Sequence, residues 1–180
     1  GISLKGRVRP ELPLSIAGVP VKTDTVVLLP GSYALTTVTD QVRYGTGSLV
    51  VKRLTDAPTA NDLKVDLSDA GRTSAAAAVT ASLSTCAEQR SFAPTGCPFK
   101  ISVPTADPST VAWTLLSSPG DELRVTVSAT DVTRSTVEVP LRMRISYLDG
   151  TSTVSQDLAP IQAVGTIDLV ASPMTVTWTS

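Results

Sequence analysis

This chain of 180 residues contains no histidine and only two cysteines. The missing histidine excludes Ser-His-Asp and Cys-His nucleophile systems and HExxH zinc hydrolases, and it removes the commonest ligand of metal sites. Serine is plentiful, but no serine stands three positions before a lysine and no GxSxG turn occurs. We therefore predict a protein that is not an enzyme, with no catalytic residues, no metal ligands and no cofactor.

Charge is scarce as well, because only 17% of the residues are ionic and the 15 basic and 16 acidic ones leave a net charge of −1. Nucleic-acid binding normally needs a basic surface that neutralises phosphates, so no nucleic-acid partner is expected. No apolar run approaches the roughly 18 residues of a membrane-spanning helix. The chain starts at Gly1 without a leader, so we expect contact with a membrane only through an anchor upstream of this sequence.

Serine and threonine make up about a quarter of the chain, and valine is abundant. This composition favours β-structure, since β-branched side chains fit a pleated surface. Strand and turn signals alternate roughly every 8 to 12 residues in the first sixty positions, which is typical of a small all-β unit. We expect residues 1–60 to form a small β-sandwich-like module, with the polar segment 55–62 as the junction.

One strong helix signal follows this junction. Ser68 is a suitable N-cap and Asp69 suits the positive end of the helix dipole. The helix is expected to continue to about residue 87, with Ala70, Ala77 and Leu83 on one mostly small face. Gly71 costs about 1 kcal/mol relative to alanine within a helix, which predicts a weak first turn.

Strand signals fill the chain after residue 99. Residues 137–147 read as one long strand, in which Pro140 predicts an edge position or a bulge. Asp149 and Gly150 predict a type I′ hairpin turn. The fold class is therefore α+β: residues 61–180 form a domain in which one long helix packs on an antiparallel sheet.

The cysteines are Cys86, in the expected last helical turn, and Cys97, eleven positions later. Two thiols without histidine cannot complete a four-ligand zinc site, and the spacing is not the CxxC of redox centres. A loop that turns at residues 94–96 would return Cys97 to the helix end. We predict a disulfide that closes the crossover from helix to strand, and hence an oxidising compartment.

Several motifs resemble the exported region of actinobacterial single-pass membrane proteins. They are LSDAGRTS at 67–74, STC at 84–86, APTGCPF at 93–99, SYLDG at 146–150, GTIDL at 165–169 and VTW at 176–178. The segments IAGVP at 16–20 and LPGSY at 29–33 resemble a PEGA-type surface β module. The resemblance implies an extracytoplasmic, cell-surface location and a cystatin- or NTF2-like second half. It implies no reaction and no catalytic residues.

Two carboxylate pairs could serve a glycosidase without histidine, namely Asp121 with Glu122 and Asp66 with Asp69. A turn and a helix start also explain these acids. Trp113 and Trp178 could present rings to a sugar, but in strands tryptophan more often belongs to the core. We expect both in the core.

Three functions remain open from the sequence. The first is a non-catalytic interaction or sensing module of a membrane-anchored bacterial envelope protein, with a protein or cell-wall component as partner and its β edges as contact surfaces. The second is a small-ligand-binding domain with a pocket between helix and sheet. The third is a hydrolase that works through two carboxylates.

Overall fold

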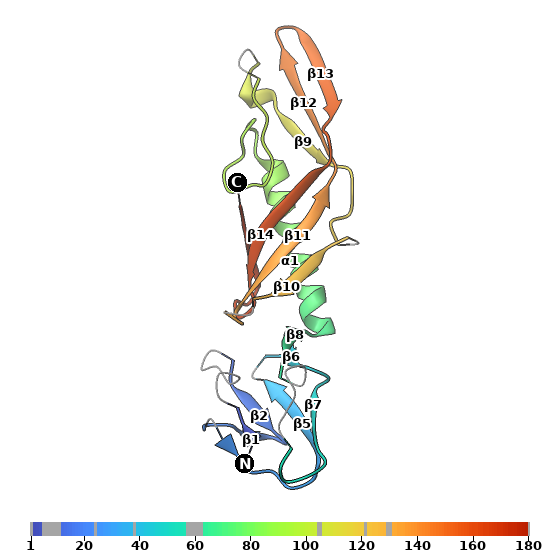
Figure 1. The fold of residues 1–180 in the computed structure, drawn as a ribbon. Coiled ribbons are helices and arrows are strands. Elements are labelled where there is room, and N and C mark those ends of the chain that lie inside the picture. Colours follow the sequence, from blue (N-terminus) through green and yellow to red (C-terminus); the bar gives the residue numbers. More distant parts are fainter. Residues whose placement is uncertain are drawn as a thin grey trace. The chain divides into compact units, whose positions relative to one another are not determined.

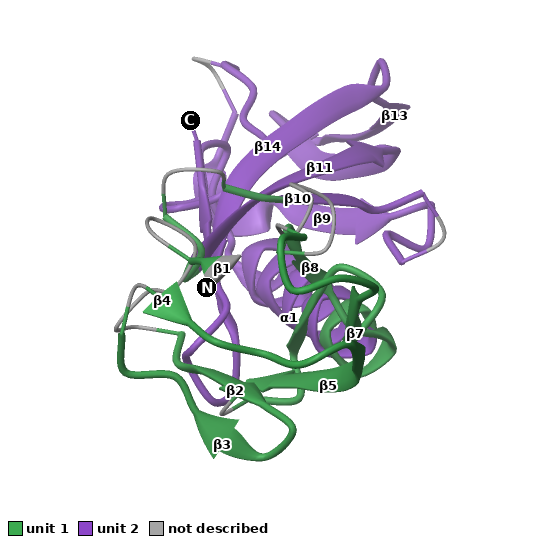
Figure 2. Cartoon of the chain, turned by 60° about the horizontal axis from the view of Figure 1, so that its bottom comes forward, with its two compact units in different colours: residues 1–72, 127–133 green, residues 73–126, 134–180 purple. Residues whose placement is uncertain are grey.

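The computed structural model describes residues 2–4, 12–23, 25–37, 39–56, 63–103, 106–120, 122–128 and 131–179. The fold mixes many strands with one long helix that packs against sheets, which is compatible with the predicted α+β class (Figure 1). The chain divides into two compact units, coloured separately in Figure 2: residues 1–72 with 127–133, and residues 73–126 with 134–180. We call them unit 1 and unit 2. The expected domain boundary at residues 60 and 61 lies outside the described residues.

Unit 1 contains short antiparallel strands. A four-stranded sheet has the order β3-β2-β5-β7, and two further pairs are β1-β4 and β6-β8. The bounds are β1 Ile2–Ser3, β2 Leu14–Ile16, β3 Val19–Pro20, β4 Thr25–Val26, β5 Gly31–Thr37, β6 Val42–Tyr44, β7 Ser48–Val51 and β8 Val65–Leu67. Burial alternates along β6, where Val42 and Tyr44 are buried and Arg43 is exposed. The Tyr44 hydroxyl donates a hydrogen bond to the carbonyl of Leu12 across this core.

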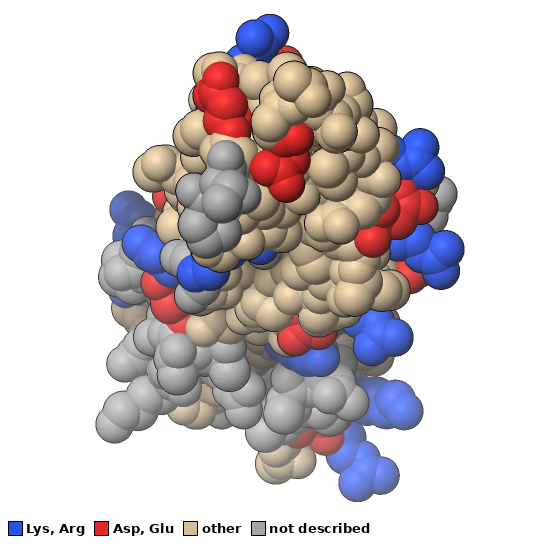
Figure 3. Space-filling model, turned by 90° about the horizontal axis from the view of Figure 1, so that it is seen from above, with Lys and Arg blue, Asp and Glu red and all other residues tan. Residues whose placement is uncertain are grey.

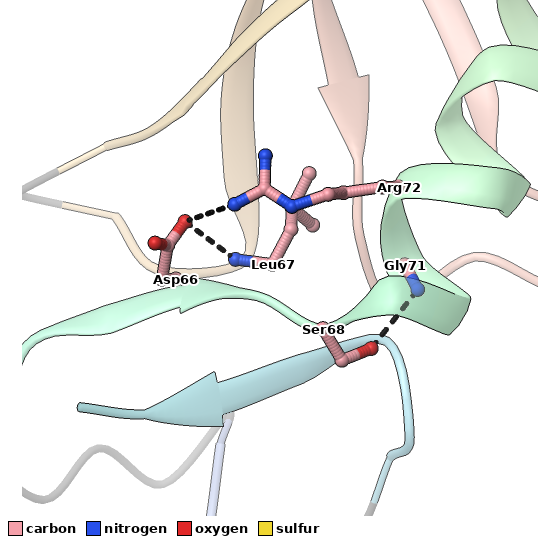
Figure 4. A network of polar contacts seen from close by, with 5 residues as sticks. All are labelled: Asp66, Leu67, Ser68, Gly71 and Arg72. Carbon is pink, nitrogen blue, oxygen red and sulfur yellow. Dashed lines mark hydrogen bonds and ion pairs between the residues drawn. The ribbon is translucent and has the colours of Figure 1, made fainter. Parts of the chain in front are cut away.

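Helix α1 spans Asp69–Glu88 and begins as the sequence predicts. The Ser68 side chain accepts a hydrogen bond of 3.0 Å from the amide of Gly71, which is the N-cap geometry (Figure 4). Ser68 also donates to the carbonyl of Asp40, and its amide donates to the carbonyl of Gln41 at 3.0 Å. The residues that cap the helix therefore also attach its first turn to the loop before β6.

The buried stripe of α1 differs from the expected one. Ala75, Val79, Leu83 and Cys86 are each at most 4% exposed, whereas Ala70 and Ala77 are exposed. The spacing of four, four and three residues keeps one narrow face inward. Because alanine, serine and threonine occur all around this helix, composition alone does not distinguish its buried face.

Unit 2 contains two antiparallel sheets, with strand orders β10-β11-β14-β15 and β13-β12-β9. The bounds are η1 Pro108–Thr110, β9 Ala112–Leu115, β10 Arg124–Val127, β11 Arg134–Leu141, β12 Met143–Asp149, β13 Ser152–Asp157, β14 Ile161–Asp168 and β15 Thr175–Trp178. The Trp178 indole donates a hydrogen bond of 2.9 Å to the Ser82 hydroxyl of α1. The face of the first sheet that carries Trp178 and its register partner Gly165 is therefore the face toward the helix.

The single strand expected over residues 137–147 is two strands in two different sheets. β11 ends at Leu141, β12 begins at Met143, and only Arg142 separates them. β11 lies between β10 and β14 and is therefore an interior strand of its sheet, whereas the expectation of an edge position or a bulge concerns Pro140 alone and stays a prediction. β10 has four residues and β11 has eight, so β11 extends beyond its shorter neighbour.

The expected hairpin at Asp149 is present, with its turn one residue later. Asp149 pairs with Ser152, so the loop consists of Gly150 and Thr151. Gly150 has φ of 62°, and Thr151 is not among the residues with positive φ. Positive φ at the first loop residue alone is the type II′ pattern rather than type I′.

The first turn of α1 yields a test in which helix propensity and packing predict opposite signs. A Cβ atom on Gly71 would lie 1.9 Å from the carbonyl oxygen of Gln41. We expect Gly71→Ala to destabilise the protein by about 2 kcal/mol in urea unfolding, because the backbone must move to remove this overlap. Ala81→Gly, at an exposed position of the helix, calibrates propensity and should cost about 1 kcal/mol. A Gly71→Ala protein more stable than the wild type would contradict the close approach.

Candidate functional site

The crossover from α1 to the strands is closed by the disulfide Cys86–Cys97, which confirms the predicted pairing. The Cα atoms of the two cysteines are 5.7 Å apart, and both residues are buried. Gln89 spans the same loop: its side chain donates to the carbonyl of Thr95 at 3.2 Å and accepts from the amide of Thr95 at 2.9 Å. The loop is therefore held by the disulfide and by the side chain of Gln89, which also donates to the Cys97 sulfur at 3.4 Å.

Aromatic side chains attach this crossover to the β13-β12-β9 sheet. Phe99 lies against Trp113 of β9 with ring centroids 4.7 Å apart, and Phe92 meets Tyr147 of β12 edge-on at 5.2 Å. The Trp113 indole donates a hydrogen bond of 2.8 Å to the carbonyl of Ser91. The polar end of the tryptophan is thus satisfied while its ring is buried.

Strand β13 forms one edge of this sheet. In an antiparallel pair of strands, every second pair of opposite residues exchanges backbone hydrogen bonds. In the β12–β13 hairpin this series runs from Asp149 and Ser152 to Met143 and Leu158, where the Leu158 amide donates to the Met143 carbonyl. The backbone groups of Thr153, Ser155 and Asp157 consequently point away from β12. Within the described chain, no backbone hydrogen bond reaches these three residues from outside the sheet.

The side chains along β13 are mostly neutral and exposed. Only Asp157 is charged, and its carboxylate accepts a hydrogen bond of 2.6 Å from Arg144 on the neighbouring strand. This bond holds the pKa of the Asp157 carboxyl below its ordinary value and raises the pKa of Arg144. Figure 3 is the view from above Figure 1, and residues other than Lys, Arg, Asp and Glu cover most of the upper part of that view.

A hollow of about 790 Å³ lies on the β10-β11-β14 sheet, and its lining residues are Glu122, Leu123, Arg124, Glu138, Pro140, Gln162 and Val164. Glu138 is the register partner of Val164, and Pro140 is the partner of Gln162. The alternate residues Val137, Val139 and Ala163 are buried. The hollow therefore lies on the outward face of the sheet, opposite the face that meets α1.

The two carboxylate pairs weighed from the sequence have different surroundings. Asp66 accepts hydrogen bonds from the Leu67 amide at 2.8 Å and from the Arg72 guanidinium at 3.5 Å, beside the N-cap (Figure 4). Asp69 follows in the first turn of α1. Asp121 lies outside the described residues, while Glu122 lines the hollow together with Glu138.

The aromatic residues follow the expectation of a core role. Trp113 and Trp178 are each 6% exposed, so neither presents its ring to solvent. The residues that sequence reasoning missed are Glu138 and Gln162, which reach the hollow from two strands. Alternation could have placed Glu138 on the outward face, but no sequence signal pairs β11 with β14.

Among the described residues, no three His, Cys, Asp or Glu side chains come together in a way that could hold a metal ion. In the same part of the chain, no helix has the length and hydropathy to cross a membrane. Comparisons with protein-family models, with curated proteins and with solved structures find no match. The resemblance described from the sequence motifs therefore stays a prediction.

The disulfide predicts a redox-dependent stability. Replacing both cysteines (Cys86→Ala with Cys97→Ala) should lower the free energy of unfolding by about 3 kcal/mol, because the open loop gains entropy in the unfolded chain. Urea unfolding of the reduced wild type should match that of the double variant, and reductant should leave the double variant unchanged. Equal stability of the oxidised and reduced wild type would contradict this stabilising role.

The ion pair on β12 and β13 predicts a pH dependence. Since the folded-state pKa of Asp157 is depressed, its contribution to stability is present above the unfolded-state pKa and is lost as pH falls through the folded-state pKa. NMR titration should show Asp157 titrating below about 3.9 in the wild type and closer to that value in Arg144→Gln. Arg142→Gln, on the same exposed face, is the control. An Asp157 pKa that Arg144→Gln leaves unchanged would rule out the ion pair in solution.

Proposed function

We propose that this chain is a non-catalytic, extracytoplasmic interaction module that belongs to a membrane-anchored protein of a bacterial envelope. The observation that carries the proposal is the unpaired edge of β13, because strand addition is a common way for a protein to bind an extended segment of another. The partner is a protein with an extended segment that pairs with residues 153–157.

The disulfide supports the location. Structural disulfides persist in oxidising compartments and are rare in the cytosol, and Cys86–Cys97 is an intramolecular bond that ties two parts of one loop. An extracytoplasmic position is compatible with this bond. The family resemblance of the cysteine segments leads to the same compartment, with the anchor upstream of Gly1.

We also propose that two parts of the chain have different folds and different roles. Residues 1–60 would form a PEGA-like β module, and residues 61–180 would form a cystatin- or NTF2-like α+β domain. The short strands before α1 and the helix with its later strands support this order of parts, while β8 pairs with β6 and so belongs with the first part. The α+β part would present the binding edge, while the β module would act as a spacer or second contact.

The edge of β13 has the features expected for strand addition. Three consecutive outward positions, Thr153, Ser155 and Asp157, offer backbone donors and acceptors in one line. Proteins usually protect such edges with lysine, proline or a bulge, and β13 (STVSQD) contains neither lysine nor proline. Its one charge is engaged by Arg144. An incoming strand therefore meets little electrostatic repulsion.

Site-specific crosslinking in the cells that make the protein tests this edge. A photo-reactive amino acid at Ser155 should give a covalent adduct with a partner protein, whereas the same amino acid at Ser84, on the exposed face of α1, should not. Thr153→Pro in the Ser155 crosslinking chain should reduce the adduct about tenfold or more, because proline removes an outward donor and obstructs the approaching strand.

Thr153→Ala keeps the backbone amide and is the matched control, so its adduct should match that of the unaltered edge. Thermal melting should show that Thr153→Pro stays folded, since its amide makes no bond to β12. The absence of any adduct at Ser155, or an adduct that survives Thr153→Pro unchanged, would contradict strand addition at β13.

A further inference from the structure

The hollow on the outward face of the β10-β11-β14 sheet carries charges of both signs that are not paired with each other. Glu122, Glu138, Arg124 and Gln162 all line it. Among the described residues, none of these four side chains takes part in a hydrogen bond or an ion pair. Arg124 and Glu138 come from neighbouring strands, where opposite charges commonly form a cross-strand pair. Here the two side chains do not pair with each other.

The shape and lining suit a small molecule. A volume of about 790 Å³ falls within the range of roughly 300 to 1,000 Å³ that is typical of small-ligand sites. Leu123, Pro140 and Val164 are half-buried and provide apolar surface beside the exposed polar side chains. The hollow thus combines apolar surface with a small number of polar groups.

The polar side chains that line the hollow determine which chemical groups a ligand must carry. Carboxylates accept hydrogen bonds from ammonium groups, and a guanidinium donates two parallel bonds to a carboxylate. Two glutamates and one arginine therefore match two ammonium groups and one carboxylate. Among the residues that the structure describes, no aromatic side chain lines the hollow, so this part of it lacks the stacking surface that would favour a sugar ring.

We propose that this hollow binds a small diamino carboxylic acid or a short peptide that carries one extra amino group. Glu122 and Glu138 bind the two ammonium groups, Arg124 binds the carboxylate, and Gln162 hydrogen-bonds to an amide or carboxylate oxygen. The site uses a different sheet and different residues from the β13 edge, so binding in the hollow does not depend on strand addition at β13.

Binding of matched dipeptide probes tests the site. The wild-type chain is titrated with lysyl-alanine, which carries two ammonium groups and one carboxylate, and amide resonances are followed by NMR. We expect saturable shifts at residues 122–124, 138–140 and 162–164. Alanyl-alanine, with one ammonium group fewer, should bind about tenfold more weakly, and diacetylated lysyl-alanine should not bind at all.

Variants assign each role. Glu138→Gln should weaken lysyl-alanine about tenfold, and Arg124→Gln should do the same. Lysyl-alaninamide lacks the carboxylate, so its affinity should be insensitive to Arg124→Gln and still sensitive to Glu138→Gln. Glu88→Gln removes an exposed acid at the end of α1 and should leave every probe unaffected.

Two results would overturn the proposal. One is the absence of saturable shifts in the hollow with lysyl-alanine. The other is equal weakening of lysyl-alanine by Glu88→Gln and Glu138→Gln, which would indicate general attraction to an acidic surface. Strand addition at β13 is read from crosslinking at Ser155, so neither result changes the conclusion on that edge.

Discussion

The structure of unit 2 depends on the closure of the crossover between Cys86 and Cys97. Cys97 follows Cys86, in the last turn of α1, by eleven positions, and the loop between them has little regular structure of its own. The disulfide brings its two ends together, Gln89 ties its middle, and Phe92 and Phe99 pack onto β12 and β9. Without this closure, the aromatic contacts would have to offset the entropy of a longer free loop.

Small residues provide a second constraint in each unit. A Cβ atom on Gly165 would lie 2.7 Å from the carbonyl of Thr177 and 3.0 Å from the Trp178 ring. The missing side chain therefore lets β15 and its tryptophan lie close to β14. In unit 1, Gly71 lets the first turn of α1 approach the carbonyl of Gln41. Glycine has a low propensity for helices and for strands, but at both positions the close packing leaves no room for a side chain.

The two sheets of unit 2 present two different kinds of surface. The β13-β12-β9 sheet ends in a strand with free backbone groups and few charges, which suits an extended polypeptide. The β10-β11-β14-β15 sheet presents, on its outward face, a hollow with separated charges, which suits a small ionic ligand. The chain passes from β11, in the sheet with the hollow, to β12, in the sheet with the free edge, and only Arg142 separates the two strands.

Local patterns were sufficient for the features that local chemistry controls. The N-cap at Ser68 and the pairing of the only two cysteines depend on spacings within about a dozen residues, and the burial of both tryptophans follows from their strand positions. The hairpin at Gly150 was also predicted, with its turn displaced by one residue. In contrast, the sequence did not identify the buried stripe of α1, because alanine is equally acceptable on a buried or an exposed face.

Only the tertiary structure decided which strands became neighbours. Alternation places Glu138 on one face of β11, but the hollow exists because β14 brings Gln162 and Val164 beside it, from about 25 positions further along the chain. The same holds for Gly71, whose need for a missing side chain arises from a carbonyl thirty positions earlier. Sequence spacing determines the local conformation and the outward side of each element, whereas long-range backbone pairing determines what each side meets.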